Sequence, residues 1–368
     1  MEKKYIPFEA IAKFMVKVLV KAGIPEEDSK IIADVLIQAD KLGFDSHGVN
    51  RLKPIYLDRI KDGIVNPVTD FKIVKEGPTT AVIDGQNGMG HVISYNAMKM
   101  ALNKAKKFGM GMVVVRNSSH YGFAGYYPLM AVRENMIGIT GTNARPSIAP
   151  TFGVENMMGT NPLTFGIPTD EPFPFLLDCA TSITQRGKIE LYEREGKNLP
   201  KGWVIDENGE SKTNSAEVLK DLIAGKAALT PLGGIGEETA GYKGYGYATV
   251  VEILSAALQQ GNYMKMLLGF QDGKKVPYNL GHFFIVIDIN AFTDPKDFKK
   301  TTGDILREIR ASKKMPGQTR IYTAGEKEYI TWLERKDKGV PFNDELMAEF
   351  RGLCNSYNLK EFLPLFEG

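Results

Sequence analysis

The chain has 368 residues, more than the roughly 100 to 200 of a single typical domain, which favours two domains with a large buried core. Hydrophobic residues make up 43% and charged residues 24%, as in an ordinary globular protein, so a disordered chain is excluded. The net charge is only +2, and no basic tract is interleaved with aromatics, which argues against nucleic acid as a partner.

Cysteine and histidine are scarce. Cys179 and Cys354 are too few for a disulfide scaffold or a zinc ribbon, and the four histidines are scattered, so no metal site is expected. No stretch approaches the ~20 apolar residues of a membrane span, and the first residues lack the apolar core of a signal peptide. We therefore expect a cytoplasmic protein that does not bind a membrane.

The amino-terminal third predicts helices. Apolar residues recur every three to four positions in a first helix, which Gly23 and Pro25 interrupt. These apolar positions are Ile11, Phe14, Met15, Val18 and Leu19. A second helix is expected from about Glu26 and a third over residues 52–61.

From about residue 74 the pattern changes to strands and helices that alternate. Short apolar runs predict strands at 81–83, 112–115, 137–141, 163–167, 175–178 and 283–289. Longer amphipathic stretches predict helices at 93–108, 249–258 and 295–312. Residues 190–214 are polar and turn-rich, which indicates a surface excursion around Trp203. The lysines at 104, 106 and 107 indicate a solvated helix face.

The tail returns to helix, and chain ends commonly lie near one another. The sequence therefore predicts an α/β protein with a mixed sheet in residues 74–299 and a helical domain built from both chain ends, residues 1–73 and 300–368.

The common nucleotide-binding motifs are missing. No Gly-x-Gly-x-x-Gly opens a helix, and no Gly-x-x-x-x-Gly-Lys-Ser/Thr is present, so neither the Rossmann fingerprint nor the phosphate-binding P-loop can be invoked. His-Glu-x-x-His and Gly-x-Ser-x-Gly are absent as well.

Two histidines lie in loops dense with small polar residues, at 45–51 and 117–122. Histidine titrates near neutral pH, so His47 or His120 could take the hydroxyl proton while hydride leaves carbon in the oxidation of a 2-hydroxyacid. Arg51 offers a planar fork for the substrate carboxylate. The alternative for each histidine is a loop residue that satisfies backbone groups, which is also the role we assign to His91 and His282.

Strand ends supply further candidates for a ligand site. Thr160 and Asn161 follow Gly159, and small residues with hydroxyls follow Asp178, where exposed amides can hold a pyrophosphate without a Rossmann motif. Lys243 could meet a phosphate because Gly244 permits close approach. The alternatives are a simple turn at 160–161 and an exposed turn lysine at 243.

Taken together, five motifs resemble the malate/L-lactate/sulfolactate dehydrogenase family, which also contains ureidoglycolate dehydrogenase and diketogulonate reductase. They are Asp-Ser-His-Gly at 45–48 with Arg51, Ser-Ser-His-Tyr-Gly at 118–122, Gly-Thr-Asn-Pro-Leu at 159–163, Leu-Asp-Cys-Ala-Thr-Ser at 177–182 and Lys-Gly-Tyr-Gly at 243–246. The resemblance runs in order from about residue 5 to 330, and the five together are highly specific.

The resemblance implies a homodimer with a non-Rossmann cofactor domain, NAD or NADP as cofactor, and a substrate site completed near the subunit interface. His120 matches the usual proton acceptor, and Ser46, His47 and Arg51 match the substrate-side loop. Cofactor-contacting positions of the family match Asp178, Cys179, Ala180, Lys243, Ala324, Gly325 and Glu326.

The chain departs from its relatives in three places. Ala324 stands where relatives commonly carry proline, and Tyr56 stands five residues after Arg51 where many relatives have four. The excursion around Trp203 lacks the Asp-Pro that relatives often show near residues 213 and 214. These changes affect details more than the class.

The predicted function is the oxidation of malate to oxaloacetate, with a small 2-hydroxy or 2-oxo acid as the molecular partner. One alternative is a reductase of a related substrate, such as diketogulonate, ureidoglycolate, sulfolactate or a cyclic imine acid. Another is a catalytically inactive dimeric binding protein, because fold does not fix function. The sequence leaves open NAD against NADP, and His120 against His47 as the residue that transfers the proton.

Overall fold

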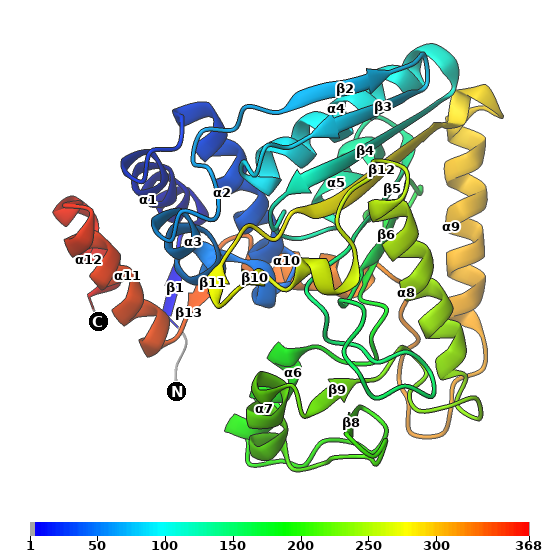
Figure 1. Cartoon of the computed structure of the whole chain (residues 1–368). Helices are drawn as coiled ribbons and strands as arrows, with labels where there is room; N and C mark the ends of the chain where they lie inside the picture. The colour runs from blue at the N-terminus through cyan, green and yellow to red at the C-terminus, as the bar shows by residue number, and fades with distance from the viewer. Residues whose placement is uncertain (1–3, 368) are drawn as a thin grey trace.

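The computed structural model describes residues 4–367 and centres on a mixed seven-stranded sheet (Figure 1). The strands stand in the order β2-β3-β4-β12-β5-β6-β7, and only the pair β3 and β4 is parallel. Their bounds are β2 (Lys72–Glu76), β3 (Thr80–Asp84), β4 (Met110–Ser118), β5 (Met136–Thr142), β6 (Leu163–Ile167), β7 (Phe175–Cys179) and β12 (Leu280–Asp288). The predicted mixed sheet is confirmed.

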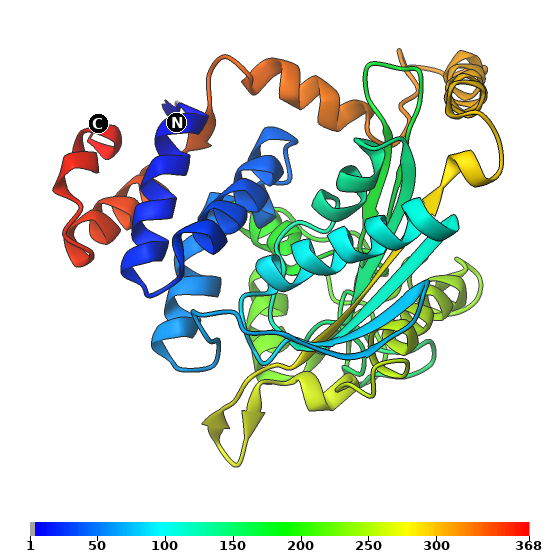
Figure 2. The same ribbon diagram turned by 90° about the horizontal axis from the view of Figure 1, so that it is seen from above.

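Helices cover both faces of this sheet (Figure 2). Because side chains alternate along a strand, Val113 and Val115 of β4 join one apolar cluster with α4 (Gly90–Phe108) and α5 (Tyr126–Val132). Val114, between them, joins the opposite cluster with Val251 of α8 (Gly241–Ala256). The near-continuous apolar run of β4 is therefore explained by burial on both faces.

Both chain ends build one helical unit, as predicted. The elements are β1 (Lys4–Ile6), α1 (Phe8–Lys21), α2 (Glu26–Lys41), β13 (Val340–Phe342), α11 (Asp344–Ser356) and α12 (Leu363–Phe366). β1 pairs with β13, and Phe14 of α1 packs on Phe350 and Phe366 with ring centroids 5.5 and 5.0 Å apart. All five apolar positions predicted for the first helix are fully buried.

The helices α9 (Pro295–Ala311) and α10 (Glu326–Arg335) lie apart from each other. Figure 1 shows α9 at the side of the molecule opposite the chain termini, where Arg307 pairs with Asp170. α10 contacts α2 of the helical unit. The boundary expected at residue 300 falls inside α9, and the division into domains stays a prediction.

Residues 186–229 form a small lobe with its own core. The segment around Trp203 was expected to be a polar, turn-rich excursion, but it belongs to this packed lobe. The lobe contains α6 (Arg186–Arg194), β8 (Val204–Asp206), α7 (Ser215–Ala224) and β9 (Ala227–Leu229). Ile189, Val204 and Val218 are fully buried in its interior. Polar residues separate these apolar positions too widely for a clear period, but Asn214 caps α7 by accepting from the amide of Glu217.

Two other local expectations need correction. α8 begins eight residues before the expected residue 249, so Lys243 lies in its first turn. Lys104 is 7% exposed and does not lie on a solvated face, because its Nζ donates to Glu76 and to the carbonyl of Gly77, both at 2.8 Å.

Short elements complete the chain. They are η1 (Asp45–His47), η2 (Val49–Arg51), the π-helix η3 (Leu52–Leu57), α3 (Asp58–Lys61), η4 (Met264–Leu267), β10 (Phe270–Gln271), β11 (Lys274–Lys275), η5 (Ile289–Ala291) and η6 (Lys360–Phe362). None of the helices within residues 4–367 combines the length and apolar character that a membrane span requires.

Candidate active site

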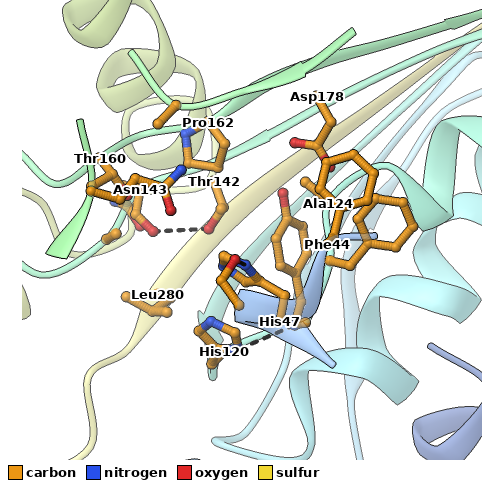
Figure 3. Close-up of a pocket in the computed structure, with 17 residues that line it drawn as sticks. Phe44, His47, His120, Ala124, Thr142, Asn143, Thr160, Pro162, Asp178 and Leu280 are labelled. Carbon is orange, nitrogen blue, oxygen red and sulfur yellow. Dashed lines mark hydrogen bonds between the residues drawn. The ribbon is translucent and has the colours of Figure 1, made fainter. Parts of the chain in front are cut away.

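One end of the sheet carries a cavity of about 160 Å³ between the strands and the loop at η1 (Figure 3). β4 and β5 both run antiparallel to β12, so their carboxyl ends meet the start of β12 at the same end of the sheet. β6 begins and β7 ends there as well. Six of the candidate residues line this cavity: Ser46, His47, His120, Thr160, Asp178 and Ala180.

His120 is held by two neighbours of one ring nitrogen. Its Nδ1 lies 2.8 Å from the hydroxyl oxygen of Tyr56 and accepts a hydrogen bond of 3.2 Å from the amide of Gly122. Desolvation and the nearby positive charges, including Arg59 and Arg51, lower the pKa of His120 well below the ordinary value. The ring is therefore neutral at neutral pH and can accept a proton.

Tyr56 reaches His120 because the chain makes a π-helical turn. Residues 52–57 follow the wider i to i+5 pattern, which places Tyr56 in the buried interior beside His120 although five positions separate it from Arg51. A π-helical turn in an otherwise helical segment accommodates one additional residue. The altered spacing noted in the sequence is therefore compatible with a site contact for Tyr56.

His47 lies beside His120 with the two ring planes nearly parallel, 14° apart, and the centroids separated by 5.8 Å. Its Nδ1 lies 2.8 Å from the hydroxyl of Ser46. Desolvation, followed by the charge of Arg51, lowers the pKa of His47 to about 4. Two neutral imidazoles thus face one cavity, and both remain candidates for proton transfer.

The loop that carries His47 is fixed from two helices. The buried carboxylate of Asp40, in α2, accepts from the amide of Val49 at 2.8 Å. A Cβ on Gly48 would lie 2.0 Å from Asp40 Oδ1, so only glycine fits there. From α10, Arg335 pairs with both carboxylate oxygens of Asp45.

Arg51 does not line the cavity. Its Nε donates to the carbonyl of Ser46 at 2.5 Å, which supports the loop. In residues 4–367 its side chain makes no other hydrogen bond, so its remaining guanidinium N–H groups are free for an anion. The predicted role as a carboxylate fork stays a prediction.

Asp178 lines the cavity opposite the histidines (Figure 3). Its carboxylate accepts from the amide of Gly125 at 2.7 Å and from the hydroxyl of Thr164 at 3.1 Å, across the pair of strands β6 and β7. Burial raises the pKa of Asp178 to about 6. The side chain thus joins the sheet to the start of α5 as well as facing the cavity.

The neighbouring candidates divide into lining and supporting residues. Thr160 lines the cavity, whereas Asn161 is fully buried and donates to Glu252 at 2.7 Å, a structural role. Thr181 connects the two strand ends, because its amide donates to the carbonyl of Thr160 at 2.9 Å. Cys179 does not line the cavity.

The start of α8 adjoins this strand end. The amide of Leu232 donates to the carbonyl of Thr181 at 2.8 Å, and a Cβ on Gly244 would lie 2.1 Å from the carbonyl oxygen of Leu232. The close approach that Gly244 permits is therefore to the backbone of this chain. Lys243 is exposed, and no side chain caps this 16-residue helix. The predicted contact of Lys243 with a phosphate stays a prediction.

The segment at 324–326 supports the edge strand β7 and does not line the cavity. The amide of Leu176 donates to the carbonyl of Ala324 at 3.4 Å, and Gly325 has a φ of +92° with the carbonyl of Pro174 close by. Glu326 is buried and accepts from the amide of Thr323.

Several lining residues were not singled out from the sequence, among them Phe44, Thr142, Asn143, Gln185 and Leu280. The hydroxyl of Thr142 lies 2.7 Å from Nδ1 of the buried His282. Gly-Thr-Asn at 141–143 repeats the triplet at 159–161, and its position directly after a predicted strand was the signal that could have identified it.

Comparison with known proteins gives a consistent result. The profile of the family Malate/L-lactate dehydrogenase matches residues 6–351. A malate dehydrogenase from Pyrococcus horikoshii is 45% identical, covering 95% of this chain and 94% of the relative, and an L-sulfolactate dehydrogenase from Methanocaldococcus jannaschii is 38% identical, covering 94% and 95%. The crystal structure of malate dehydrogenase from Entamoeba histolytica superposes with a TM-score of 0.93 at 46% identity, covering 97% of this chain and 99% of that one.

Proposed function

Since this chain belongs to the malate/L-lactate dehydrogenase family of nicotinamide-dependent enzymes, we propose that it oxidises malate to oxaloacetate. The observation that carries the proposal is the neutral His120 at the cavity, with the hydroxyl of Tyr56 beside its Nδ1. Relatives at 45% and 46% identity that are named malate dehydrogenases support the choice of acid.

His120 accepts the hydroxyl proton of malate. A neutral imidazole bears a proton on only one nitrogen, so the other nitrogen takes the proton, and the hydroxyl of Tyr56, 2.8 Å from Nδ1, can donate to the ring or accept from it. His47 lies beside this ring and, with Ser46, positions the substrate. Arg51 binds the carboxylate next to the reacting carbon with the N–H groups that Ser46 leaves free.

A bound nicotinamide cofactor, NAD or NADP, would supply the acceptor for the hydride from C2 of malate. Thr160, Asp178 and Ala180 line the cavity where its nicotinamide ring would bind. The first turn of α8, with Lys243, suits the pyrophosphate because uncapped amides and a lysine both favour an anion. With the hydride removed in this way, His120 takes the one proton that malate must also lose to become oxaloacetate.

A second copy of the chain covers the outer face of α8. Tyr247, Val250 and Ile253 of this helix are 56%, 47% and 54% exposed although they are apolar. A contiguous apolar surface of this kind marks an interface, and we infer a homodimer from it. The two free cysteines are consistent with a reducing compartment, the cytoplasm.

A panel of acids tests the proposal. Purified protein is mixed with NAD or NADP and with malate, L-lactate, sulfolactate or ureidoglycolate, and the absorbance of reduced nicotinamide is followed. Malate is expected to give the highest kcat/KM. Faster turnover of another acid would replace malate as the substrate, and no turnover of any acid with either cofactor would favour the inactive binding protein.

A further inference from the structure

Three arginines in the segments next to the cavity have no acidic partner. They are Arg51, Arg59 and Arg145, and within residues 4–367 none of them forms an ion pair with a carboxylate. Other arginines of the chain do: Arg116 pairs with Asp84, and Arg335 pairs with Asp45. A partly desolvated guanidinium without a counter-charge is unfavourable until an anion binds.

Arg59 is linked to the reacting end of the cavity through Tyr56. It follows Tyr56 by three residues and therefore shares its helix face, and Tyr56 contacts His120. Its guanidinium lies over the ring of Tyr278, 4.5 Å from the centroid. Tyr278 precedes Leu280, a lining residue, by two positions, so Arg59 joins the turn that carries Tyr56 to the segment that leads into the cavity wall.

The electrostatics agree with this placement. The positive charge of Arg59 contributes to the lowered pKa of His120. Burial and the charge of Arg145 in turn lower the pKa of Arg59. Arg145 directly follows Ala144, another lining residue. These groups repel one another across the same region, which therefore has an excess of positive charge that a dianion would neutralise.

We propose that Arg59, with Arg145 beside it, binds the second acid group of the substrate and so selects 2-hydroxy diacids over monoacids such as lactate. The proposal rests on the proposed function, in which Arg51 holds the carboxylate next to the reacting carbon. The far group is the second carboxylate of malate or a sulfonate in the same place. Arginine suits either, because its planar fork donates two parallel hydrogen bonds to a planar or tetrahedral oxyanion.

The variant Arg59→Met tests the proposal, with Lys61→Met as the matched control that removes an exposed cation from the same helix. In Arg59→Met, kcat/KM for malate should fall roughly 10- to 100-fold, mainly through KM, while kcat/KM for L-lactate changes less than about threefold. Arg59→Lys should recover part of the loss. Equal losses on malate and lactate, or a weakened affinity for the cofactor alone, would overturn the proposal.

A binding measurement separates this proposal from the proposed function, since it requires no turnover. Succinate has two carboxylates and no hydroxyl, and butyrate has one carboxylate on a chain of equal length. In calorimetric titrations of the unmodified protein, succinate should bind at least about tenfold more tightly than butyrate, and Arg59→Met should abolish the preference. If neither protein distinguishes the two acids, Arg59 does not recognise the second group, even if malate is oxidised.

Discussion

The hydroxyl oxygen of Tyr56 lies 2.8 Å from Nδ1 of His120. Among the described residues that contact this nitrogen, Tyr56 alone can accept a hydrogen bond from it, because the other neighbour, the amide of Gly122, is only a donor. The amide of Gly122 favours an unprotonated Nδ1, whereas the hydroxyl of Tyr56 can donate to this nitrogen or accept from it, so Tyr56 is a partner for His120 both before and after it takes a proton.

Replacing Tyr56 by phenylalanine should destabilise the protonated form of His120. With only the amide of Gly122 facing Nδ1, this nitrogen has no acceptor when the ring is a cation, so His120 becomes a weaker base. We expect kcat for malate oxidation to fall about 10- to 100-fold, within the ~10² to 10⁴ that a general base contributes. Steady-state kinetics measure this, and a change confined to KM would instead indicate a substrate contact.

The pH dependence of kcat/KM should reflect the lowered pKa of His120. Oxidation needs the neutral ring, so activity is lost only when the pH falls through that pKa, which desolvation and nearby positive charges hold well below the ordinary 6.5. The protein should therefore retain its kcat/KM at about pH 6. In Arg59→Met the acid limb should move to higher pH, because a charge that lowers the pKa is removed. An acid limb at the ordinary histidine pKa in the unmodified protein would contradict the assignment.

Asp178 should make folding stability depend on pH. Burial raises its folded-state pKa to about 6 from an ordinary 3.8, so the protonated form is favoured in the folded protein. Its contribution to stability is greatest below the ordinary value and declines as the pH rises through about 6. As the pH rises over this range, the Tm of the unmodified protein should fall relative to the Tm of Asp178→Asn, and calorimetry measures both. A difference independent of pH would mean that Asp178 does not titrate there.

Two glycines of α8 form a matched pair. A Cβ at position 244 would lie 2.1 Å from the backbone oxygen of Leu232, whereas a Cβ at position 246 would meet nothing within 4 Å. Gly244→Ala should lower the free energy of unfolding by about 1 to 3 kcal/mol, and Gly246→Ala should raise it by about 0.5 to 1 kcal/mol. Denaturant titrations measure both. Equal effects would show that the contact with Leu232 is not rigid.

The regular parts of the fold could be predicted because their side-chain periods are simple. The strand expected at 163–167 has those bounds in the structure, and the first helix buries all five residues that its period marked. Both segments have a single buried face or a short apolar run, so local pattern and tertiary packing agree.

The lobe at 186–229 and the buried Lys104 could not be predicted from the local pattern. Ile189, Val204 and Val218 are far apart in the sequence and meet only in the folded lobe. Lys104 looks like a surface lysine in sequence, and its partner Glu76 is 28 residues away. In both cases the environment is set by distant residues.

The site was predicted in part. The resemblance and the chemistry of the loops singled out six residues that line the cavity, but not the contact of Tyr56 with His120. That contact depends on the π-helical turn at 52–57. A single additional residue in a helix leaves no repeating pattern of apolar residues from which the turn could be predicted. Arg59 was missed because its neighbour Tyr278 belongs to a distant segment.

The most direct test of the account is the turnover of His120→Ala measured beside its affinity for the reduced cofactor. In the proposed function His120 acts on the hydroxyl proton of malate and not on the nucleotide, so kcat should fall by ~10² to 10⁴ while the Kd of the cofactor, from its fluorescence, changes less than about threefold. Near-native turnover in His120→Ala at neutral pH would contradict the account and transfer the role of the base to His47.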